Sequence, residues 1–270
     1  MTTSPVSPAQ LADPWRFLSD GAAQLGAPLN EEQMQLFRGY TGLLQAANQQ
    51  FNLTAVRDLP GMVAKLHLDS LSLLGPIASA AGLDIAGLRQ SGWRAADVGS
   101  GAGIPGLPLL LAWPGLRLSL IESVQKKGVF LRQTLAAINK TAFVLIERAE
   151  IVGQQPAHRG GYDLVVARAV AEMTTLAELT IPLARVGGLV VLPKGAKASD
   201  ECAAAGFAIH LLGAEVVGVE TLAVPGVEES RAAVILRKTR PTPPAYPRRP
   251  GLPAKRPLTG RSDPQGLGDL

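Results

Sequence analysis

The sequence predicts an α/β protein with a doubly wound, mostly parallel sheet and a helical segment in front of it. From residue 93 onward, short apolar runs bounded by turn residues alternate with stretches of helical apolar spacing, a pattern typical of parallel sheets. The first of these runs leads into a glycine-rich turn that opens a helix. The first ninety residues show helical spacing and no strand pattern, which predicts a helical N-terminal extension.

The N-terminal part is expected to consist of a disordered stretch, residues 1–13, and the helical extension, residues 14–90. Asn30 precedes two glutamates and is a typical helix start, because its side chain can cap the first turn and acids favour a helix N-terminus. One apolar stripe follows at helical spacing: Leu36, Phe37, Tyr40, Leu43, Leu44 and Ala47. A polar turn over Asn48–Asp58 separates this helix from a second one, expected over Pro60–Ala81.

Residues 91–238 are expected to hold the seven-stranded sheet. Five parallel strands are predicted at Ala95–Val98, Leu116–Ile121, Ala142–Ile146, Leu164–Ala167 and Gly188–Leu192. The helices between them are predicted at Pro108–Trp113, Gln125–Ile138 and Ala171–Leu183. Two last strands, Ala214–Val219 and Ala232–Arg237, are joined by a loop without a long helical pattern. At least one of them should therefore be antiparallel, because a parallel pair needs a longer crossover.

Residues 239–270 are expected to form a basic, proline-rich tail. Residues 237–270 carry 8 Lys and Arg against 2 Asp, a charge of +6, whereas residues 1–236 carry 18 against 20, a charge of −2. Eight of the 21 prolines lie in residues 238–270, which favours extended or turn-like backbone. A concentrated basic segment indicates a polyanionic partner, although a solvated tail that maintains solubility fits the charge equally well.

Composition excludes several classes of protein. Hydrophobic residues make up 47% of the chain, which excludes wholesale disorder, and no apolar run approaches the roughly 20 residues of a membrane-spanning helix. No basic-then-apolar secretory signal is visible at the N-terminus. The single cysteine, Cys202, is expected to be a small core residue, and the three scattered histidines do not have the spacing of zinc ligands. We expect a soluble, cytoplasmic monomer that binds no metal and no membrane.

The glycine-rich turn over residues 97–106 is the most informative segment. Gly99, Gly101 and Gly103 follow a strand, where glycines permit a tight turn and close approach of a ligand. The Gly-Lys-Ser/Thr ending of a phosphate loop is missing, and the spacing differs from the Gly-x-Gly-x-x-Gly of nicotinamide sites. Asp97 beside the turn favours a ligand with an amino group, such as S-adenosylmethionine. The alternative is that the glycines only shape the turn.

Three further residues are candidates for the same site. Glu122 ends the second strand, where an acid accepts ribose hydroxyls. Its distance along the chain from the glycine turn fits a nicotinamide dinucleotide as well as S-adenosylmethionine. Glu150 follows the third strand, where adenine contacts are usual, and could equally be a solvated acid. Arg168 closes the fourth strand and is expected to point into the crevice. Its alternative is a structural ion pair, for instance with Glu172.

The residues that are missing restrict the chemistry of a methyl transfer. Methylation at pyrimidine C5 needs a cysteine nucleophile, and Cys202 lies in an expected alanine-rich helix. Exocyclic amines are often held by Asn/Asp-Pro-Pro-aromatic elements, but residues 167–170 read Ala-Arg-Ala-Val. A ring nitrogen such as guanine N7 carries no proton and has an in-plane lone pair, so orientation alone would suffice. No catalytic base is therefore required.

These motifs together resemble the RsmG/GidB family of bacterial small-subunit ribosomal RNA methyltransferases, over about residues 30–258. The resemblance rests on residues 52–58 (NLTAVRD), 68–70 (LDS), 97–106, 168–169 (RA), 194–195 (KG) and 246–258 (YPRRPGLPAKRPL). It implies a class I S-adenosylmethionine-dependent methyltransferase fold, which is Rossmann-like. It also implies S-adenosylmethionine as methyl donor and N7 of guanine 527 in 16S rRNA as target. The second hypothesis is a methyltransferase that acts on another RNA, a protein or a small molecule. The third is a protein that binds S-adenosylmethionine or nucleic acid without catalysing a reaction.

The resemblance assigns the predicted site by position. The cofactor-binding residues would be Asp97, Gly99, Gly101, Gly103, Ile104, Glu122, Ser123, Val124, Ala149, Glu150 and Arg168, with residues 122–124 at the ribose and residues 149–150 at the adenine. Arg168 is also the candidate for positioning the substrate. The family places a histidine three residues before the aspartate of Leu-Asp-Ser. Leu66 stands there in this chain and His67 follows, so we give His67 no catalytic role and expect a partly buried, hydrogen-bonded structural residue.

A polyanionic substrate would give the basic residues a function, because phosphate contacts supply affinity without sequence information. The RNA-binding candidates are Arg57, Lys126, Lys127, Arg132, Lys194, Arg248, Arg249, Lys255 and Arg256. The four in the tail lie among prolines, which stiffen the backbone. Taken alone, each of these cations except Lys194 is better explained by ordinary solvation, whereas the cations of the tail taken together favour RNA contact.

Overall fold

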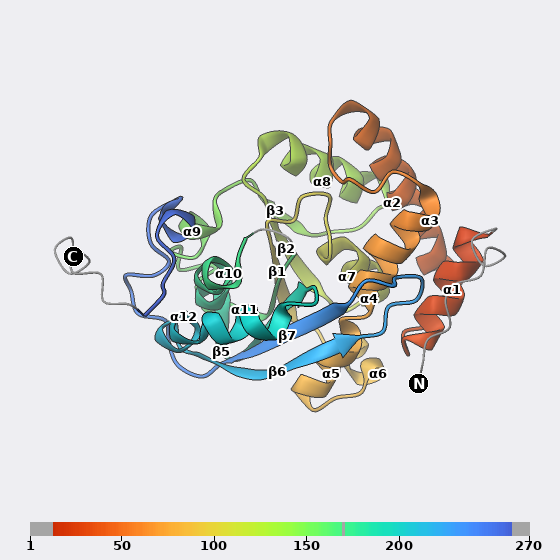
Figure 1. The fold of residues 1–270 in the computed structure, drawn as a ribbon. Coiled ribbons are helices and arrows are strands. Elements are labelled where there is room, and N and C mark those ends of the chain that lie inside the picture. The colour runs from red at the N-terminus through yellow and green to blue at the C-terminus, as the bar shows by residue number, and fades with distance from the viewer. Residues whose placement is uncertain (1–12, 169–170, 261–270) are drawn as a thin grey trace.

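The computed structural model describes residues 13–168 and 171–260, and Figure 1 shows its fold. Residues 1–12 of the N-terminal stretch expected to be disordered lie outside the described residues. The last ten residues of the tail, 261–270, also lie outside them. Helix α1, Pro14–Gln24, is capped by the Asp13 side chain. Helix α2, Glu31–Gln50, begins with a capping box between Asn30 and Gln33, so the predicted helix start is confirmed.

The second predicted N-terminal helix is divided into several pieces. They are α3 (Leu59–Met62), a π-helical segment η1 (Val63–Leu68), α4 (Asp69–Leu71) and α5 (Leu74–Ala81). A further short helix, α6 (Ile85–Gln90), follows beyond the predicted range. Ser70 Oγ donates to the carbonyl of Leu66 at 2.5 Å, and Ser72 Oγ donates to that of Asp69 at 2.7 Å. Because such hydroxyls compete for backbone carbonyls, they favour the local departures from α-helix geometry. The apolar spacing alone did not reveal these breaks.

The described residues form one seven-stranded sheet in the order β3-β2-β1-β4-β5-β7-β6. The strands are β1 (Arg94–Val98), β2 (Arg117–Ile121), β3 (Phe143–Leu145), β4 (Tyr162–Ala167), β5 (Ala184–Lys194), β6 (Ala214–Leu222) and β7 (Arg231–Lys238). Strand β7 is antiparallel to both of its neighbours, whereas β1 to β5 pair in parallel. The predicted fold class, with its antiparallel terminal pair, is confirmed.

Strand β5 begins four residues earlier than predicted. Its register against β4 shifts after the Tyr162–Ala184 pair, and Gly187 in the shifted stretch has a φ of 84°. This irregularity interrupts the alternation of side chains, so only the apolar second half of the strand is visible in the sequence. The helix after β4 begins two residues later than predicted and ends at Leu183, as predicted. It comprises α10, Met173–Thr180, and a 3₁₀ turn η2, Ile181–Leu183, which contains Pro182.

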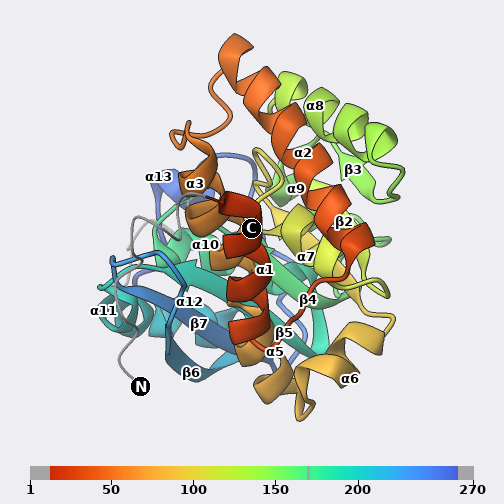
Figure 2. The ribbon, with the colours of Figure 1, turned by 90° about the vertical axis from the view of Figure 1, so that its right-hand side faces the viewer.

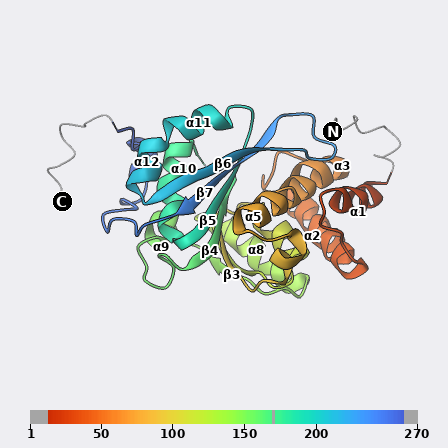
Figure 3. The ribbon, with the colours of Figure 1, turned by 90° about the horizontal axis from the view of Figure 1, so that it is seen from below.

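Helices cover both faces of the sheet (Figure 3). The N-terminal helices with α7 (Gly106–Ala112) and α8 (Gln125–Ala137) pack on one face, and Figure 2 shows α2 running alongside α8. Helices α9 (Ala149–Val152), α10, α11 (Ala198–Ala204) and α12 (Gly206–Leu211) cover the other face. Successive strand residues alternate between the two cores: Ala95 and Leu164 face one, Ala96 and Val165 the other. Cys202 is buried in α11, as expected.

The basic tail is folded back onto the domain. We call residues 239–260 the strap. It contains one helical turn, α13 (Leu252–Lys255), and runs beside α9, α10 and α12 (Figure 1). Arg159 holds its first half, donating to the carbonyls of Thr242, Pro243 and Tyr246. The strap is thus extended or turn-like, as the prolines predicted, but it is attached to the domain rather than projecting from it.

Candidate cofactor site and substrate crevice

The glycine turn connects the end of β1 to α7. Gly99, Gly101 and Gly103 have φ values of 70°, 57° and 96°, a region of backbone that side chains rarely adopt. A Cβ at Gly103 would lie 2.5 Å from the Leu107 side chain, whereas the space at Gly101 is open, its nearest neighbour being the Gly99 carbonyl at 3.8 Å. Gly103 is therefore required for packing, and Gly101 leaves room for a ligand against the backbone.

Glu122 braces this turn from the neighbouring strand. Its Oε2 accepts the Gly101 N–H at 2.8 Å, and its Oε1 accepts the Val124 N–H at 2.7 Å. The side chain is buried. Both carboxylate oxygens are therefore engaged by backbone, so Glu122 fixes the position of Gly101 relative to the end of β2. The sequence placed Glu122 at the site but did not show this bracing, and its contact with a ribose stays a prediction.

Asp97 is fully buried beneath the turn. Its Oδ2 accepts the Gly106 N–H at 3.1 Å, while its Oδ1 has no hydrogen-bond partner. Burial raises the pKa of this carboxyl to about 7, opposed by the hydrogen bond from the Gly106 N–H. An unpartnered carboxylate oxygen next to the glycine turn suits a ligand with an ammonium group, because an opposite charge would restore the ionised form.

Tyr40 ties the helical extension to the same turn. Its hydroxyl donates to the carbonyl of Ala102 at 2.8 Å, and the residue is fully buried in α2. Burial and the nearby Asp97 charge raise the pKa of the Tyr40 phenol. The hydroxyl therefore stays a donor at physiological pH. The sequence assigned Tyr40 only to the apolar stripe of α2, and periodicity gives no signal for such a hydrogen bond.

A cavity of about 100 Å³ adjoins the turn at the carboxyl ends of β1 and β2. Its lining includes the predicted residues Gly99, Ser123, Ala149 and Glu150, together with Val98, Ile121, Glu147, Arg148 and Leu179, which the sequence did not indicate. Small-molecule pockets usually span about 300–1,000 Å³, so this cavity is smaller than a typical ligand pocket. The remaining predicted residues, among them Asp97 and Ile104, lie on the glycine-turn side, outside the cavity lining.

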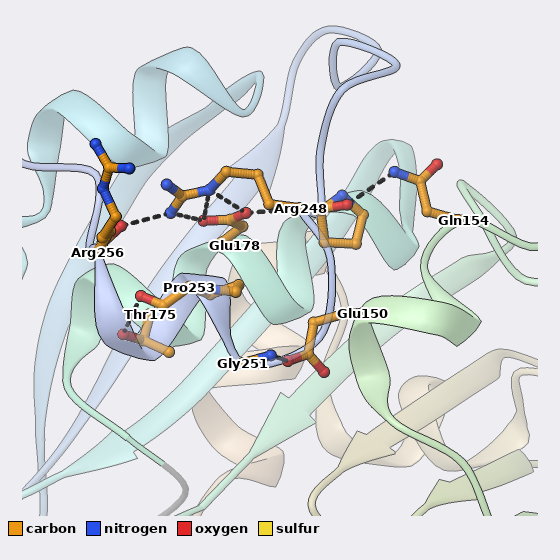
Figure 4. Close-up of polar contacts among 9 residues, drawn as sticks. Glu150, Gln154, Thr175, Glu178, Arg248, Gly251, Pro253 and Arg256 are labelled. Atoms are coloured by element: carbon orange, nitrogen blue, oxygen red, sulfur yellow. Dashed lines mark hydrogen bonds and ion pairs between the residues drawn. The ribbon is translucent and has the colours of Figure 1, made fainter. Parts of the chain in front are cut away.

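The wall formed by α9 is fastened to the strap. Glu150 is buried, and its Oε1 accepts the Gly251 N–H at 2.8 Å and the Arg148 guanidinium at 3.1 Å. Figure 4 shows Gly251 approaching Glu150 from the strap. The interpretation of Glu150 as a solvated loop acid is therefore wrong, because its carboxylate is enclosed and hydrogen-bonded. Its role toward an adenine stays a prediction.

Arg168 takes part in a cluster of charges around the buried Asp69, at the end of β4. Its guanidinium lies 2.8 Å from Asp69 Oδ2 and donates to the carbonyl of Lys65 at 2.9 Å. Arg231, at the start of β7, lies 3.2 Å from Asp69 Oδ1. Burial raises the pKa of the Asp69 carboxyl, and the two guanidiniums oppose that rise. The partner of Arg168 is thus Asp69 rather than the suggested Glu172, because the π-helical segment brings Asp69 over the end of the sheet.

His67 occupies a structural position. It is fully buried, and its Nε2 lies 2.8 Å from Thr41 Oγ1. The rings of Phe37 and Tyr40 pack around it. Burial lowers the pKa of the imidazole to about 3, so the ring is neutral throughout the physiological range. This arrangement agrees with the structural role expected from its displaced position in the sequence.

The predicted RNA-binding cations fall into two groups. Some side chains are engaged by protein groups: Lys194 pairs with Glu201 at 2.8 Å, and Arg248 pairs with the buried Glu178 at 2.6 Å. Others are exposed or half-exposed, and several of these also contact protein groups: Arg57, Lys126, Lys127 and Arg132 near the first turns of α8 and the loop after α2, and Arg249, Lys255 and Arg256 on the strap. Arg57 donates to Asn52 Oδ1 at 3.2 Å, and Arg132 donates to the Val144 carbonyl at 3.1 Å. Lys126 stacks over the Phe51 ring at 5.7 Å from its centroid. Contact of any of them with RNA stays a prediction.

The strand order, the antiparallel β7 and the glycine turn after β1 define a class I S-adenosylmethionine-dependent methyltransferase fold. A model of the family described as "GidB: rRNA small subunit methyltransferase G" matches residues 33–230. The chain belongs to this family.

Named relatives extend the similarity beyond the matched range. The ribosomal RNA small subunit methyltransferase G of Roseiflexus sp. (strain RS-1) is 45% identical over 242 residues, covering 89% of this chain and 98% of the relative. The protein of the same name from Chloroflexus aggregans is 43% identical over 249 residues, 90% and 98% of the two chains. That of Pelotomaculum thermopropionicum is 40% identical over 242 residues, 89% and 97%. The similarity therefore spans nearly the whole of these relatives.

Two negative findings apply to the described residues. None of the helices they form is long and apolar enough to cross a membrane. Among the same residues, His, Cys, Asp and Glu side chains do not gather in any group of three or more that could hold a metal ion.

Proposed function

We propose that the protein transfers a methyl group from S-adenosylmethionine to N7 of guanine 527 in 16S rRNA of the small ribosomal subunit. Membership of the small-subunit rRNA methyltransferase G family, over residues 33–230, is the observation that carries this proposal. The resemblance of the motifs to the RsmG/GidB family supplies the particular base and atom. The glycine turn, the orphaned Asp97 oxygen and the adjoining cavity fit the methyl donor.

The donor supplies an electrophilic methyl group on a sulfonium. The protein's own residues bind and orient it: the backbone at Gly101 leaves open space, Glu122 holds that backbone in place, and Asp97 offers an oxygen to the ammonium. Residues 149–150 of α9, with Leu179 of α10, form the far wall of the cavity. Orientation of this kind can contribute ~7–11 kcal/mol to catalysis by removing the entropic cost of alignment.

Guanine N7 suits the charges at this site because it needs no deprotonation. In the transfer, the N7 lone pair forms the new bond to the methyl carbon, the carbon–sulfur bond breaks, and the sulfur keeps the electron pair. Of the acids near the turn, Glu122 is engaged by two backbone amides and Asp69 by two arginines, while the free Asp97 oxygen is assigned to the ammonium of the donor. We assign the positioning of the guanine to Arg168 at the end of β4, and the exposure of 22% of its side chain supports this assignment.

The test is methyl transfer from labelled S-adenosylmethionine to three substrates in parallel: unmethylated small subunits, naked 16S rRNA and transfer RNA. The expected result is label at one 16S guanine, with strand cleavage by aniline after reduction marking an N7-methylated base. Arg168→Gln should lower kcat/KM by about 10- to 100-fold, with S-adenosylhomocysteine affinity unchanged. Arg185→Gln, which breaks a pair with Asp163 at the opposite end of β4, is the matched control.

Label on transfer RNA alone, on protein, or on no RNA despite donor binding would overturn the rRNA assignment. If Arg168→Gln lowers donor affinity as much as it lowers kcat/KM, Arg168 binds the donor and does not position the substrate. Deleting the tail is a poor test of RNA contact, because Thr242, Pro247 and Pro253 of the strap are buried against the domain.

A further inference from the structure

The strap bridges the two helices that form one side of the cofactor cavity. On α10, the Thr175 hydroxyl donates to the Pro253 carbonyl at 3.2 Å. Beyond α9, the Gln154 amide donates to the Pro247 carbonyl at 2.8 Å. Figure 4 shows these contacts reaching the strap from opposite sides. The strap therefore holds α9 and α10 at a defined separation.

A further attachment is an ion pair whose carboxylate is almost completely buried and whose guanidinium is partly buried. Glu178 of α10 is 1% exposed and accepts from the Arg248 backbone N–H at 2.8 Å. The Arg248 guanidinium donates to the same carboxylate at 2.9 Å through Nε and 2.6 Å through Nη2. Its Nη2 also donates to the carbonyl of Arg256 at 2.7 Å, closing the strap into a loop. A fork-to-carboxylate contact of this kind fixes direction as well as distance.

Three residues beyond Arg248, the strap reaches the cavity wall. The Gly251 N–H donates to Glu150 Oε1 at 2.8 Å, and Glu150 lines the cavity. Gly251 has a φ of 80°, a conformation that turns its amide out of the strap and that glycine tolerates. Leu179, the residue after Glu178, lines the cavity from the α10 side. The strap therefore contacts the cavity wall at Glu150 and is anchored to α10 at Glu178, next to Leu179 of the same wall.

Resting on the proposed function, we propose that Glu178 and Arg248 are positioning residues of the methyl-donor site. The pair anchors the strap to α10, the anchored strap presents the Gly251 amide, and that amide sets the Glu150 carboxylate in the wall. Arg248 belongs, in this view, to the donor site rather than to the phosphate-binding surface. Its neighbours Arg249 and Lys255 are exposed on the outer side of the strap.

The test measures S-adenosylhomocysteine binding by calorimetry on the full-length protein, without RNA, at a temperature where circular dichroism shows every variant folded. Glu178→Gln keeps an acceptor for the Arg248 amide but removes the charge that holds the guanidinium. We expect the dissociation constant to rise about five- to tenfold. A purely structural role would lower the unfolding temperature and leave this constant unchanged.

Asp163→Asn is the matched control. Asp163 also accepts one backbone amide, that of Arg94 at 2.8 Å, and one guanidinium, that of Arg185 at 2.6 Å. It does not line the cavity. Its substitution should change S-adenosylhomocysteine affinity by less than about twofold. An equal loss of affinity in Asp163→Asn and Glu178→Gln would overturn the proposal, since general weakening of the fold would then explain both.

A double-mutant cycle tests the connection itself. If Glu178 acts through Glu150, the Glu150→Ala/Glu178→Gln protein should bind no more weakly than Glu150→Ala alone, within about twofold. If the two substitutions together weaken S-adenosylhomocysteine binding by the product of their separate effects, the proposal is overturned. Wild-type affinity in Glu178→Gln would overturn it as well. Should Glu178→Gln fail to fold, Arg248→Lys keeps the charge without the fork, and wild-type affinity there would overturn it equally. Absence of binding by the wild-type protein would instead refute the proposed donor, and the inference with it.

Discussion

Replacing Asp97 with asparagine should stabilise the protein while weakening its donor site. Asp97 is fully buried, and burial raises its pKa from the 3.8 of an exposed aspartate to about 7. A carboxyl with a raised pKa favours the protonated form in the folded state. Wild-type stability therefore falls as the pH rises from the unfolded pKa through the folded pKa, and is constant above it. Asparagine is neutral at every pH, so the variant does not lose this stability as the pH rises.

The expected magnitude follows from the two pKa values. A tenfold change in the protonation equilibrium is worth ~1.4 kcal/mol, so the Asp97 charge costs about 4 kcal/mol at pH 8 and about 2 kcal/mol at pH 5. The side-chain amide of the Asp97→Asn variant would retain an acceptor for the Gly106 N–H, but its NH₂ would lack a partner, which costs ~1–3 kcal/mol at any pH. The advantage of Asp97→Asn over wild type should therefore grow by about 2–3 kcal/mol between pH 5 and pH 8.

Urea unfolding of both proteins at pH 5 and pH 8 measures this difference directly, with Asp163→Asn as a control for loss of an acid elsewhere. Calorimetry of S-adenosylmethionine binding completes the test. The variant should bind at least about tenfold more weakly, because the donor's ammonium loses its charged partner. A stability difference that is the same at both pH values would refute the reasoning about the buried charge. Unchanged affinity would refute the role given to the free oxygen.

Three further outcomes are expected. Tyr40→Phe removes the donor to the Ala102 carbonyl and should cost ~1–3 kcal/mol in urea unfolding; unchanged stability would contradict the importance of that bond. Because the pKa of His67 is lowered to about 3, wild-type stability is complete above pH 6.5 and falls on acidification, by about 2 kcal/mol at pH 5. The His67→Leu variant should not show this part of the loss of stability at low pH. Identical stability-against-pH profiles for the variant and the wild type would exclude His67 as its source. Arg249→Ala and Lys255→Ala should each reduce the salt dependence of RNA binding by about one phosphate contact, and an unchanged slope would remove that residue from the interface.

Much of the fold was predictable because it depends on local patterns. The capped start of α2, the five parallel strands and the glycine turn each reflect periodicity or turn chemistry within a dozen residues. Boundaries were missed where a local feature interrupts the pattern. The bulge at Gly187 concealed the first half of β5, and a π-helical segment and a break after Leu71 interrupt the helix predicted over residues 60–81.

The candidate site was predictable in part, for the same reason. Gly99 and Glu122 lie at strand ends, and the carboxyl ends of parallel strands meet at one edge of the sheet. What each side chain contacts there was not predictable. Glu122 is engaged by the backbone of the turn, and Leu179 enters the cavity wall from a helix that had no recognisable motif.

The sequence by itself determined the order of elements, the fold class and the position of the glycine turn, because these follow from spacing that neighbouring residues impose. Only the tertiary structure decided which charges pair. Asp69 meets Arg168 and Arg231 from distant parts of the chain, and Glu178 meets Arg248 across 70 residues. A charged side chain has no period in the sequence, and a buried charge is stable only beside a partner that folding brings to it.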